Sequence, residues 1–287
     1  MASNLRVVTG ENTRAEPQMT SASTSPGEVT DAETQRLLRP AYRNTVLGLV
    51  VVGFALNFLD RQILSILMQP IKAELGISDT ALGFLSGLAF ALFYALIGVP
   101  LARVADRRSR RTIMAVSMAV WSGATALCGV AQNFVQLALA RFGVGVGEGG
   151  FTPAGMSLLS DYFPKERRGT ALGLVNTGPM IGTMLGLIIG GVALEHLGWR
   201  GAFMVAGIPG VIFALVFYFF VKEPWRGMAD GVRTQPKPQP PFWSGVGSLW
   251  ANRAYRYLAL GSAMSAFGLY GLSIWMPSFL MRAHEMA

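Results

Sequence analysis

The sequence is poor in the side chains that hold metals or form disulfides. Its 287 residues include one cysteine, Cys128, and two histidines, His196 and His284, which are far apart in the chain. A single cysteine excludes a disulfide framework and a zinc site built on paired cysteines. We therefore expect neither a bound metal nor a cofactor.

Charge is also scarce, since 14% of the residues are charged and 52% are hydrophobic. A soluble domain usually carries about 25% charged residues, so a soluble enzyme is disfavoured. A helix needs roughly 20 apolar residues to span a bilayer. Seven runs of suitable length and composition occur, over residues 45–69, 80–102, 112–131, 134–160, 169–194, 200–221 and 256–281.

The lysines and arginines predict how these runs cross the membrane. If the N-terminus is inside, nineteen of the 24 basic residues fall on the inner side and three on the outer side. Basic residues gather in cytoplasmic loops, so the net charge of +8 is interpreted as an anchor and not as a nucleic-acid surface. The sequence predicts a multi-pass protein of the inner (plasma) membrane with a cytoplasmic N-terminus.

Composition divides the chain into four parts. Residues 1–43 are polar, lack the features of a secretory signal and are predicted to be a disordered cytosolic tail. Residues 44–221 are predicted to form a six-helix bundle, 222–255 a cytoplasmic loop and 256–287 a seventh spanning helix. The loop is proline-rich and then carries apolar residues at helical spacing, which predict either an interfacial helix or a ragged start to the seventh span: Phe242, Trp243, Val246, Leu249 and Trp250.

Ionisable residues inside spans cost roughly 2.5–3.5 kcal/mol each and are functional candidates. The first span holds Asn57, Asp60 and Arg61, and the fourth holds Arg141 and Glu148. At about 1.5 Å per residue, Asp60 and Arg141 fall at similar depth, and we expect them to pair. Glu148 falls on the same helix face roughly 10 Å deeper, with no cation one turn away, which favours a proton-binding carboxyl. The alternative is that these residues form structural ion pairs.

Two glycine patterns stand in the fourth and fifth spans. The run from Gly143 to Gly150 contains a formal G-x-G-x-x-G, but it lacks the preceding strand that a dinucleotide site requires. We interpret it as helix that packs closely and leaves space beside Glu148. Pro179 predicts a bend in the fifth span, whose small-residue stripe consists of Gly178, Gly182, Gly186 and Gly190.

An intramembrane hydrolase is disfavoured, because Ser157 does not stand in a G-x-S-x-G motif and no catalytic set is present. The protein is therefore not expected to be an enzyme.

The stretch 98–111 resembles the signature loop of the major facilitator superfamily, G-x-x-x-D-R-x-G-R-R. Ala102 and Ser109 replace its two glycines, and Gly178-Pro179-x-x-Gly182 is similar to part of an antiporter signature in the fifth helix. More narrowly, residues 57–61, 141–148, 161–168 and 199–203 resemble the Spinster branch, so that the resemblance covers about 43–287. The signature-loop residues that match are Asp106, Arg107, Arg110 and Arg111.

This resemblance implies a six-helix half made of two inverted three-helix repeats, with the first and fourth helices lining a central cavity. It implies that Glu148 and Asp60 couple protons and that Arg61, Arg141 and Asn57 line the substrate cavity. The expected function is proton-coupled secondary transport of an amphipathic lipid or organic anion by alternating access, in a monomer if full length. The family plan has twelve spans, so a fragment, or a truncated and non-transporting remnant, is the alternative.

Overall fold

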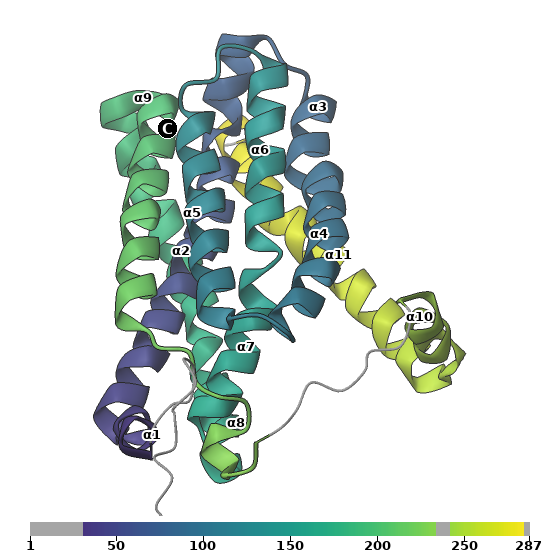
Figure 1. Ribbon diagram of the computed structural model, residues 1–287. Coiled ribbons are helices and arrows are strands. Elements are labelled where there is room, and N and C mark those ends of the chain that lie inside the picture. Colours follow the sequence, from purple (N-terminus) through teal and green to yellow (C-terminus); the bar gives the residue numbers. More distant parts are fainter. Residues whose placement is uncertain (1–30, 234–241, 284–287) are drawn as a thin grey trace, which may run out of the picture.

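The computed structural model describes residues 31–233 and 242–283, and within these ranges every regular element is a helix, which confirms the all-α expectation (Figure 1). A π-helical turn, Phe84–Ala89, joins α3 to α4, and a 3-10 turn, Met228–Asp230, follows α9. In chain order the α-helices are α1 Asp31–Leu38, α2 Pro40–Leu75, α3 Asp79–Gly83, α4 Phe90–Ala105, α5 Arg110–Cys128, α6 Phe134–Glu148, α7 Phe151–Tyr162, α8 Lys165–Val175, α9 Thr177–Phe220, α10 Phe242–Ala251 and α11 Arg253–Ala283.

Four stretches of the described chain are long and apolar enough to cross a membrane, namely 40–75, 79–105, 165–220 and 253–283. The third of these contains two legs, because Gly198 (φ 69°, ψ 179°) interrupts α9 at the junction predicted between the fifth and sixth spans. Helix α5 and the α6–α7 pair run alongside these legs (Figure 1). Each of the seven predicted apolar runs thus corresponds to a helical segment that either packs within the bundle or flanks it.

The glycine stripe of α9 lets this helix lie directly on the backbone of α2. A Cβ atom added at Gly182 would stand 2.1 Å from the carbonyl oxygen of Ala55, and one at Gly178 would stand 2.7 Å from that of Val51. Gly186 and Gly190 continue the contact one and two turns further along. The predicted close packing is confirmed, and its partner is the helix that carries Asp60 and Arg61.

The fifth leg is interrupted close to Pro179. Helix α8 ends at Val175 and α9 begins at Thr177, with Asn176 between them. Proline has no N–H, so Pro179 cannot donate to the carbonyl of Val175 four residues earlier. The interruption at Asn176 therefore adjoins the carbonyl that lacks this hydrogen bond, close to the proline at which a bend was predicted.

The fourth span was predicted to be one helix, and this is wrong. Residues 149–150 form a turn between α6 and α7. Glycine costs about 1 kcal/mol relative to alanine in a helix interior, and the turn lets Gly149 meet the backbone of α4, since a Cβ there would stand 2.9 Å from the nitrogen of Gly98. The space predicted beside Glu148 is also absent, because Gly147 lies against the backbone of Trp121.

The predicted tail, residues 1–43, is wrong over its last part, while residues 1–30 lie outside the described chain. Residues 31–38 form α1 and α2 begins at Pro40. Leu37 is buried in the core, and Trp225 donates its indole N–H to the hydroxyl of Thr34 at 3.2 Å. The polar segment 31–38 forms a helix, and the burial of its apolar residue Leu37 in the core stabilises it there.

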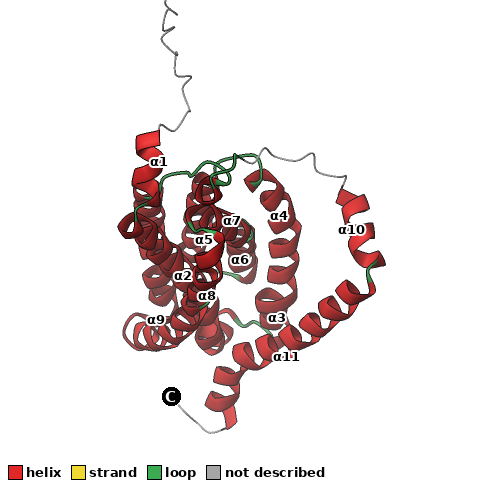
Figure 2. Ribbon diagram, turned by 90° about the horizontal axis from the view of Figure 1, so that it is seen from below, coloured by secondary structure: helices red, strands yellow, loops and turns green. Residues whose placement is uncertain are grey.

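The loop predicted over 222–255 contains a separate helix, α10. Its apolar residues therefore form a helix of their own and are not a ragged start to the seventh span. Asn252 ends α10 and caps α11, since its side-chain oxygen accepts from the N–H of Ala254 at 3.0 Å. In Figures 1 and 2, α10 lies to the side of the bundle beyond α4 and across the direction of the bundle helices. It contacts α4 through Phe242, whose ring centroid lies 5.3 Å from the guanidinium carbon of Arg103. The prolines of this loop, residues 236–241, lie outside the described chain.

Two ends of the bundle can be told apart by their elements. We call the end that gathers α1, α8 and the 103–111 and 222–233 loops the basic end (Figure 1). At the opposite end, Arg282 of α11 binds Asp79 at 2.7 Å and Gln69 at 3.0 Å. Helix α11 therefore docks at the opposite end and diverges from the bundle toward the basic end.

A buried charge cluster between helices α2 and α6

Two helices bring four charged side chains into the interior of the bundle. Helix α2 contributes Asp60 and Arg61, and α6 contributes Arg141 and Glu148. Asp60, Arg141 and Glu148 are at most 3% exposed, and the side chain of Arg61 is 20% exposed. The cluster lies between two apolar cores. One core includes Phe54, Trp121, Val144 and Phe151, and the other includes Leu59, Ile63, Cys128 and Leu137.

Glu148 is paired with Arg61. The Nη2 and Nε atoms of Arg61 stand 2.5 Å and 2.6 Å from the same carboxylate oxygen, Oε2. The expectation that Glu148 has no cation nearby is therefore wrong. The sequence-based estimate considered only residues along the helix of Glu148. Arg61 lies on a different helix, α2, and was therefore missed. Asn57, which was predicted to line the cavity, is buried and lies within hydrogen-bonding range of Glu148.

Asp60 is bound by a hydroxyl and not by Arg141. The Oγ1 atom of Thr125, on α5, donates to Oδ2 of Asp60. Arg141 has no partner within the described chain for its buried Nε and Nη1 atoms. The predicted Asp60–Arg141 pair is thus wrong, although both residues lie in the cluster as expected. Sequence reasoning missed Thr125, whose only signal was a hydroxyl in an otherwise apolar part of α5.

Aromatic rings surround the cationic part of the cluster. The guanidinium carbon of Arg61 stands 5.2 Å, 5.1 Å and 5.1 Å from the ring centroids of Phe58, Phe90 and Tyr94. That of Arg141 stands 5.8 Å from the ring of Phe90. Desolvated cation–π contacts contribute up to about 2 kcal/mol each, and they stabilise arginines at a depth where water does not.

The cluster contains two carboxyls and two guanidinium groups, so its formal charge is zero when all are ionised. Its hydrogen bonding is incomplete, because the unpartnered buried atoms include Oδ1 of Asp60, Oε1 of Glu148 and two nitrogens of Arg141. An unsatisfied buried polar group costs about 1–3 kcal/mol, and more if charged. A site with both orphan donors and orphan acceptors is suited to take up a proton, water or an anionic group.

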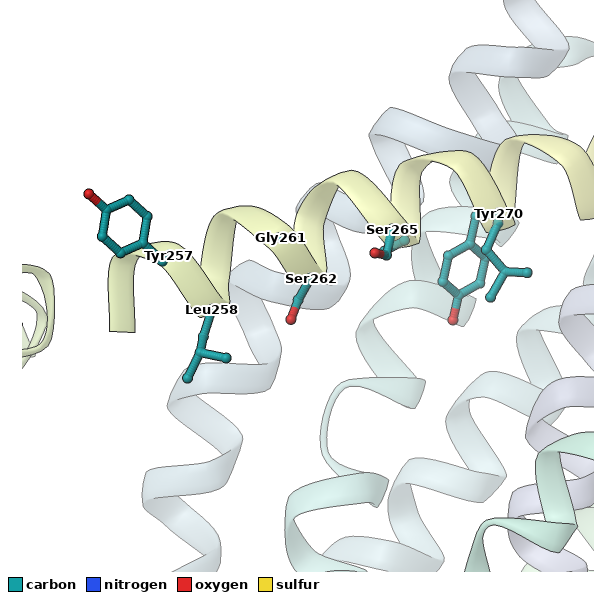
Figure 3. A pocket seen from close by; sticks show the side chains of 8 residues that line it. Tyr257, Leu258, Gly261, Ser262, Ser265 and Tyr270 are labelled. Carbon is teal, nitrogen blue, oxygen red and sulfur yellow. The ribbon is translucent and has the colours of Figure 1, made fainter. Parts of the chain in front are cut away.

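Helix α11 faces this cluster with polar side chains. Tyr270 acts electrostatically on Arg61, and Figure 3 shows its ring beside Ser265 and Ser262 on one side of the helix. A depression of about 570 Å³ follows this part of α11, from Tyr257 to Tyr270. The residues that line it all belong to α11, and none of the four charged residues of the cluster is among them.

The signature loop divides into a buried and an exposed part at the basic end. Arg110 is 1% exposed and binds Asp161, Glu223 at 2.8 Å and the carbonyl of Pro224 at 2.8 Å. Burial opposes its charge, but Glu223 and Asp161 outweigh this and keep the pKa of Arg110 above its ordinary value. The backbone N–H of Arg111 donates to Glu223 at 2.8 Å.

The other two signature residues, Asp106 and Arg107, lie exposed at the end of α4. Arg110 and Arg111 lie in one network, with acidic partners at the end of α7 and just after α9. Asp161 stands in one of the segments that resemble the Spinster branch, but neither Asp161 nor Glu223 was predicted to bind the loop. No three Cys, His, Asp or Glu side chains of the described ranges gather into a metal-binding group.

Residues 50–287 match the family model described as Major Facilitator Superfamily. The chain belongs to this family. It is an integral membrane protein of a transporter family and not an enzyme, as the sequence predicted. Within this superfamily it is 32% identical over 241 residues to an MFS-type efflux pump of Mycolicibacterium smegmatis, covering 84% of this chain and 55% of the pump.

Spinster proteins are also among its relatives. The chain is 27% identical over 251 residues to a sphingosine-1-phosphate transporter of Danio rerio, covering 86% of this chain and 49% of that protein. The crystal structure of a bacterial homolog of the human lysosomal transporter Spinster, inward-facing and occupied, aligns with a TM-score of 0.75 and 33% identity over 86% of this chain and 56% of that one. The Spinster-like resemblance is confirmed, and the chain spans about half the length of the relatives it matches.

Proposed function

We propose that this chain is the N-terminal half, with the seventh helix, of a proton-coupled secondary transporter for organic anions. The observation that carries the proposal is the buried cluster of Asp60, Arg61, Arg141 and Glu148, in which Arg141 keeps two unpaired N–H donors. Charged groups at membrane depth are costly and mark ion and substrate pathways. Membership of a transporter family supports the same conclusion.

The solute class follows from the free donors. A guanidinium presents parallel N–H groups that match a carboxylate or a phosphate, and Arg141 is the arginine of the cluster that no carboxylate occupies. The ring of Phe90 adds apolar surface beside Arg141, and the rings of Phe58 and Tyr94 add apolar surface beside the neighbouring Arg61. Relatives are named for anionic solutes, sphingosine 1-phosphate, L-galactonate and cis,cis-muconate, which supports an amphipathic or organic anion.

Charge neutrality supplies the coupling. An anion that enters the neutral cluster leaves a net negative charge in a medium of low dielectric, which is unfavourable. Protonation of Glu148 restores neutrality and releases Arg61 from the pair that now occupies it. The anion and the proton therefore bind together, and alternating access carries both across. Glu148 is the main proton site in this scheme and Asp60 the second.

The orientation belongs to the same proposal. The basic end carries the signature loop and the 222–233 segment, with Arg103, Arg107, Arg108, Arg226 and Arg233. Basic residues concentrate on the cytoplasmic side of membrane proteins. We place the basic end and the N-terminus in the cytoplasm and the protein in the plasma membrane.

The test is reconstitution, in liposomes with an acidic exterior, of the complete transporter that carries this half, measuring uptake of radiolabelled L-galactonate and sphingosine 1-phosphate. We expect uptake of at least one probe to depend on the pH gradient. Glu148→Gln keeps the shape of the protonated carboxyl and should abolish driven uptake while probe binding persists. The matched control is Glu195→Gln, the same change at an exposed position of α9.

Two results would contradict the proposal. If the complete transporter moves neither probe with or without a gradient, the proposed transport of organic anions fails. If Glu148→Gln and Glu195→Gln both transport with the parent's gradient dependence, the proton is bound elsewhere.

A further inference from the structure

The hydroxyl of Thr125 lies within a helix and donates to a carboxylate on another helix. Serine and threonine side chains in helices usually bond back to a carbonyl of the preceding turn. Thr45, Ser86 and Ser160 do so, donating to carbonyl oxygens four residues earlier at 3.0 Å, 2.9 Å and 2.8 Å. Thr125 donates instead across the helix interface to Asp60.

The other buried hydroxyls of α5 serve packing. Ser117 and Ser122 are 4% and 2% exposed. Their oxygens lie against Gly150 and Gly210, at 2.6 Å and 2.2 Å from where a Cβ would stand on those glycines. Thr125 is the buried hydroxyl of α5 whose described partner is a charged group. Its role is therefore tied to the charge cluster and not to helix contact alone.

Holding Asp60 has a consequence for Arg141. The positive charge that acts most strongly on Asp60 is that of Arg141, followed by that of Arg61, while Glu148 repels it. Opposite charges attract, so the positive charge of Arg141 draws the Asp60 carboxylate toward it. With Oδ2 of Asp60 held by Thr125, the Nε and Nη1 atoms of Arg141 are left without a partner.

We propose that Thr125 is a positioning residue of the transport site: its hydroxyl holds Asp60 on the α5 side and so keeps Arg141 open to the anionic group of the solute. This inference rests on the proposed function, because it assigns to Arg141 the recognition of the anion. The charged and titratable groups that act on Asp60 are Arg61 on its own helix, Arg141 and Glu148 on α6 and, on α5, Cys128. Thr125 is 0% exposed.

The first test needs no transport. Infrared difference spectra of the purified chain between high and low pH report carboxyl groups, and the band lost in Asp60→Asn identifies Asp60. We expect Thr125→Val to shift this band, Thr125→Ser to preserve it and the control Ser122→Ala to leave it unchanged. An Asp60 band that is the same in Thr125→Val as in the parent would overturn the hydrogen bond and the proposal with it.

The second test measures binding of L-galactonate and sphingosine 1-phosphate. Hydrogen bonds to charged groups contribute about 1.5–3 kcal/mol, so we expect Thr125→Val to weaken binding about tenfold or more. Thr125→Ser should stay within about twofold of the parent. In an Asp60→Asn background, Thr125→Val should have no further effect, because its action passes through the carboxylate.

A purely structural role of Thr125 would instead lower affinity equally in both backgrounds, and that result would overturn the proposal. If Thr125→Val does not fold, judged by circular dichroism, the smaller Thr125→Ala takes its place in both measurements. If the parent binds neither probe, the proposed function fails, while the infrared spectra still decide whether Thr125 holds Asp60.

Discussion

At the scale of single residues, the pairing of Arg61 with Glu148 is the main electrostatic contact of the membrane interior. Removing two charges from water costs several kcal/mol per ion, so a buried pair stabilises a fold little compared with apolar side chains of the same volume. The aromatic rings around Arg61 reduce this cost. A pair kept at such a cost is best explained by a site that must exchange charge.

Breaking this pair from one side should be worse than removing it. We expect Arg61→Leu to destabilise the chain by about 3–5 kcal/mol, since it leaves the Glu148 carboxylate buried and unpaired, and the double change with Glu148→Leu to recover most of that loss. Melting of the purified chain in detergent measures both. The half-exposed pair of Arg168 and Asp230 is the control, where single changes cost about 1 kcal/mol or less. Additive losses at the buried pair would contradict this prediction.

At the scale of helices, the contact of α9 with α2 fixes where Asp60 and Arg61 stand. The stripe from Gly178 to Gly190 runs along the segment of α2 that holds Asp60. Because backbone meets backbone, small changes in this contact displace the charged side chains on the other face of α2.

The tightest point of the stripe should not tolerate a methyl group. We expect Gly182→Ala to lower stability by about 1–3 kcal/mol, the usual cost of overpacking, because its Cβ would stand 2.1 Å from the Ala55 carbonyl. Gly191→Ala, on the same helix with nothing within 4 Å, should be neutral or stabilise by up to about 1 kcal/mol, as glycine is a poor helix former. Equal melting temperatures for the two variants would show that the helices can separate without cost.

Helix α10 is an element without a core of its own. None of its residues is buried, and Trp243 and Trp250 are 80% and 54% exposed. It lies across the direction of the bundle helices (Figure 2), and Arg253 and Arg256 follow it. Tryptophans beside basic residues are typical of helices that lie in the membrane interface.

If α10 lies in the interface, its tryptophans should contact lipid. In liposomes containing brominated phospholipids, we expect quenching of tryptophan fluorescence to fall clearly when Trp243 and Trp250 are changed to Phe, because bromine quenches only on contact. The same change at Trp199, which is 4% exposed, is the control and should leave the quenched fraction nearly unchanged. Insensitivity of α10 to brominated lipid would place it in water.

At the scale of the whole molecule, α11 is attached at one end only. Trp275 and Ile274 pack on the core near the opposite end, and Arg282 binds Asp79 and Gln69 there. Toward the basic end, Leu258 and Phe267 are 71% and 81% exposed, and the helix leaves the bundle (Figures 1 and 2).

The attachment of α11 should resist acid. The Arg282 guanidinium, together with Lys72, holds the pKa of Asp79 at about 2, below the value of about 3.9 for a free aspartate. A lowered pKa means that the contact contributes in full above about pH 4 and is lost as the pH falls through 2. Spin labels on cysteines at Thr80 and Ala283, in a Cys128→Ala background, should therefore keep one distance from pH 8 to about 4.

The same labels test the contact at neutral pH. Asp79→Asn should lengthen or broaden the distance at pH 7, whereas the control Asp230→Asn, at the basic end, should not. A distance that drifts between pH 7 and 5 in the parent, or that ignores Asp79→Asn, would mean that another contact holds α11.

The sequence by itself determined the helical legs, because their signals are local. An apolar run of roughly 20 residues has no stable alternative to a spanning helix in a bilayer, and a four-residue glycine period places its members on one helix face wherever the partner lies. The candidate site could be chosen for the same reason. A charged residue inside an apolar run is unusual whatever its neighbours in space are, and this singled out Asp60, Arg61, Arg141 and Glu148.

The tertiary structure decided which of these charges meet. The position of a residue along a helix gives its depth in the membrane but not how that helix is rotated relative to its neighbours. Sequence reasoning therefore assigned no cation to Glu148 and assigned Arg141 to Asp60. In the structure, Arg61 pairs with Glu148 and Thr125 binds Asp60. The break at residues 149–150 and the helix over 31–38 depend likewise on contacts with distant segments, the backbone of α4 and the core beneath Leu37. Pairing inside a membrane is a property of how helices are turned toward each other, and that is set by packing over the whole bundle.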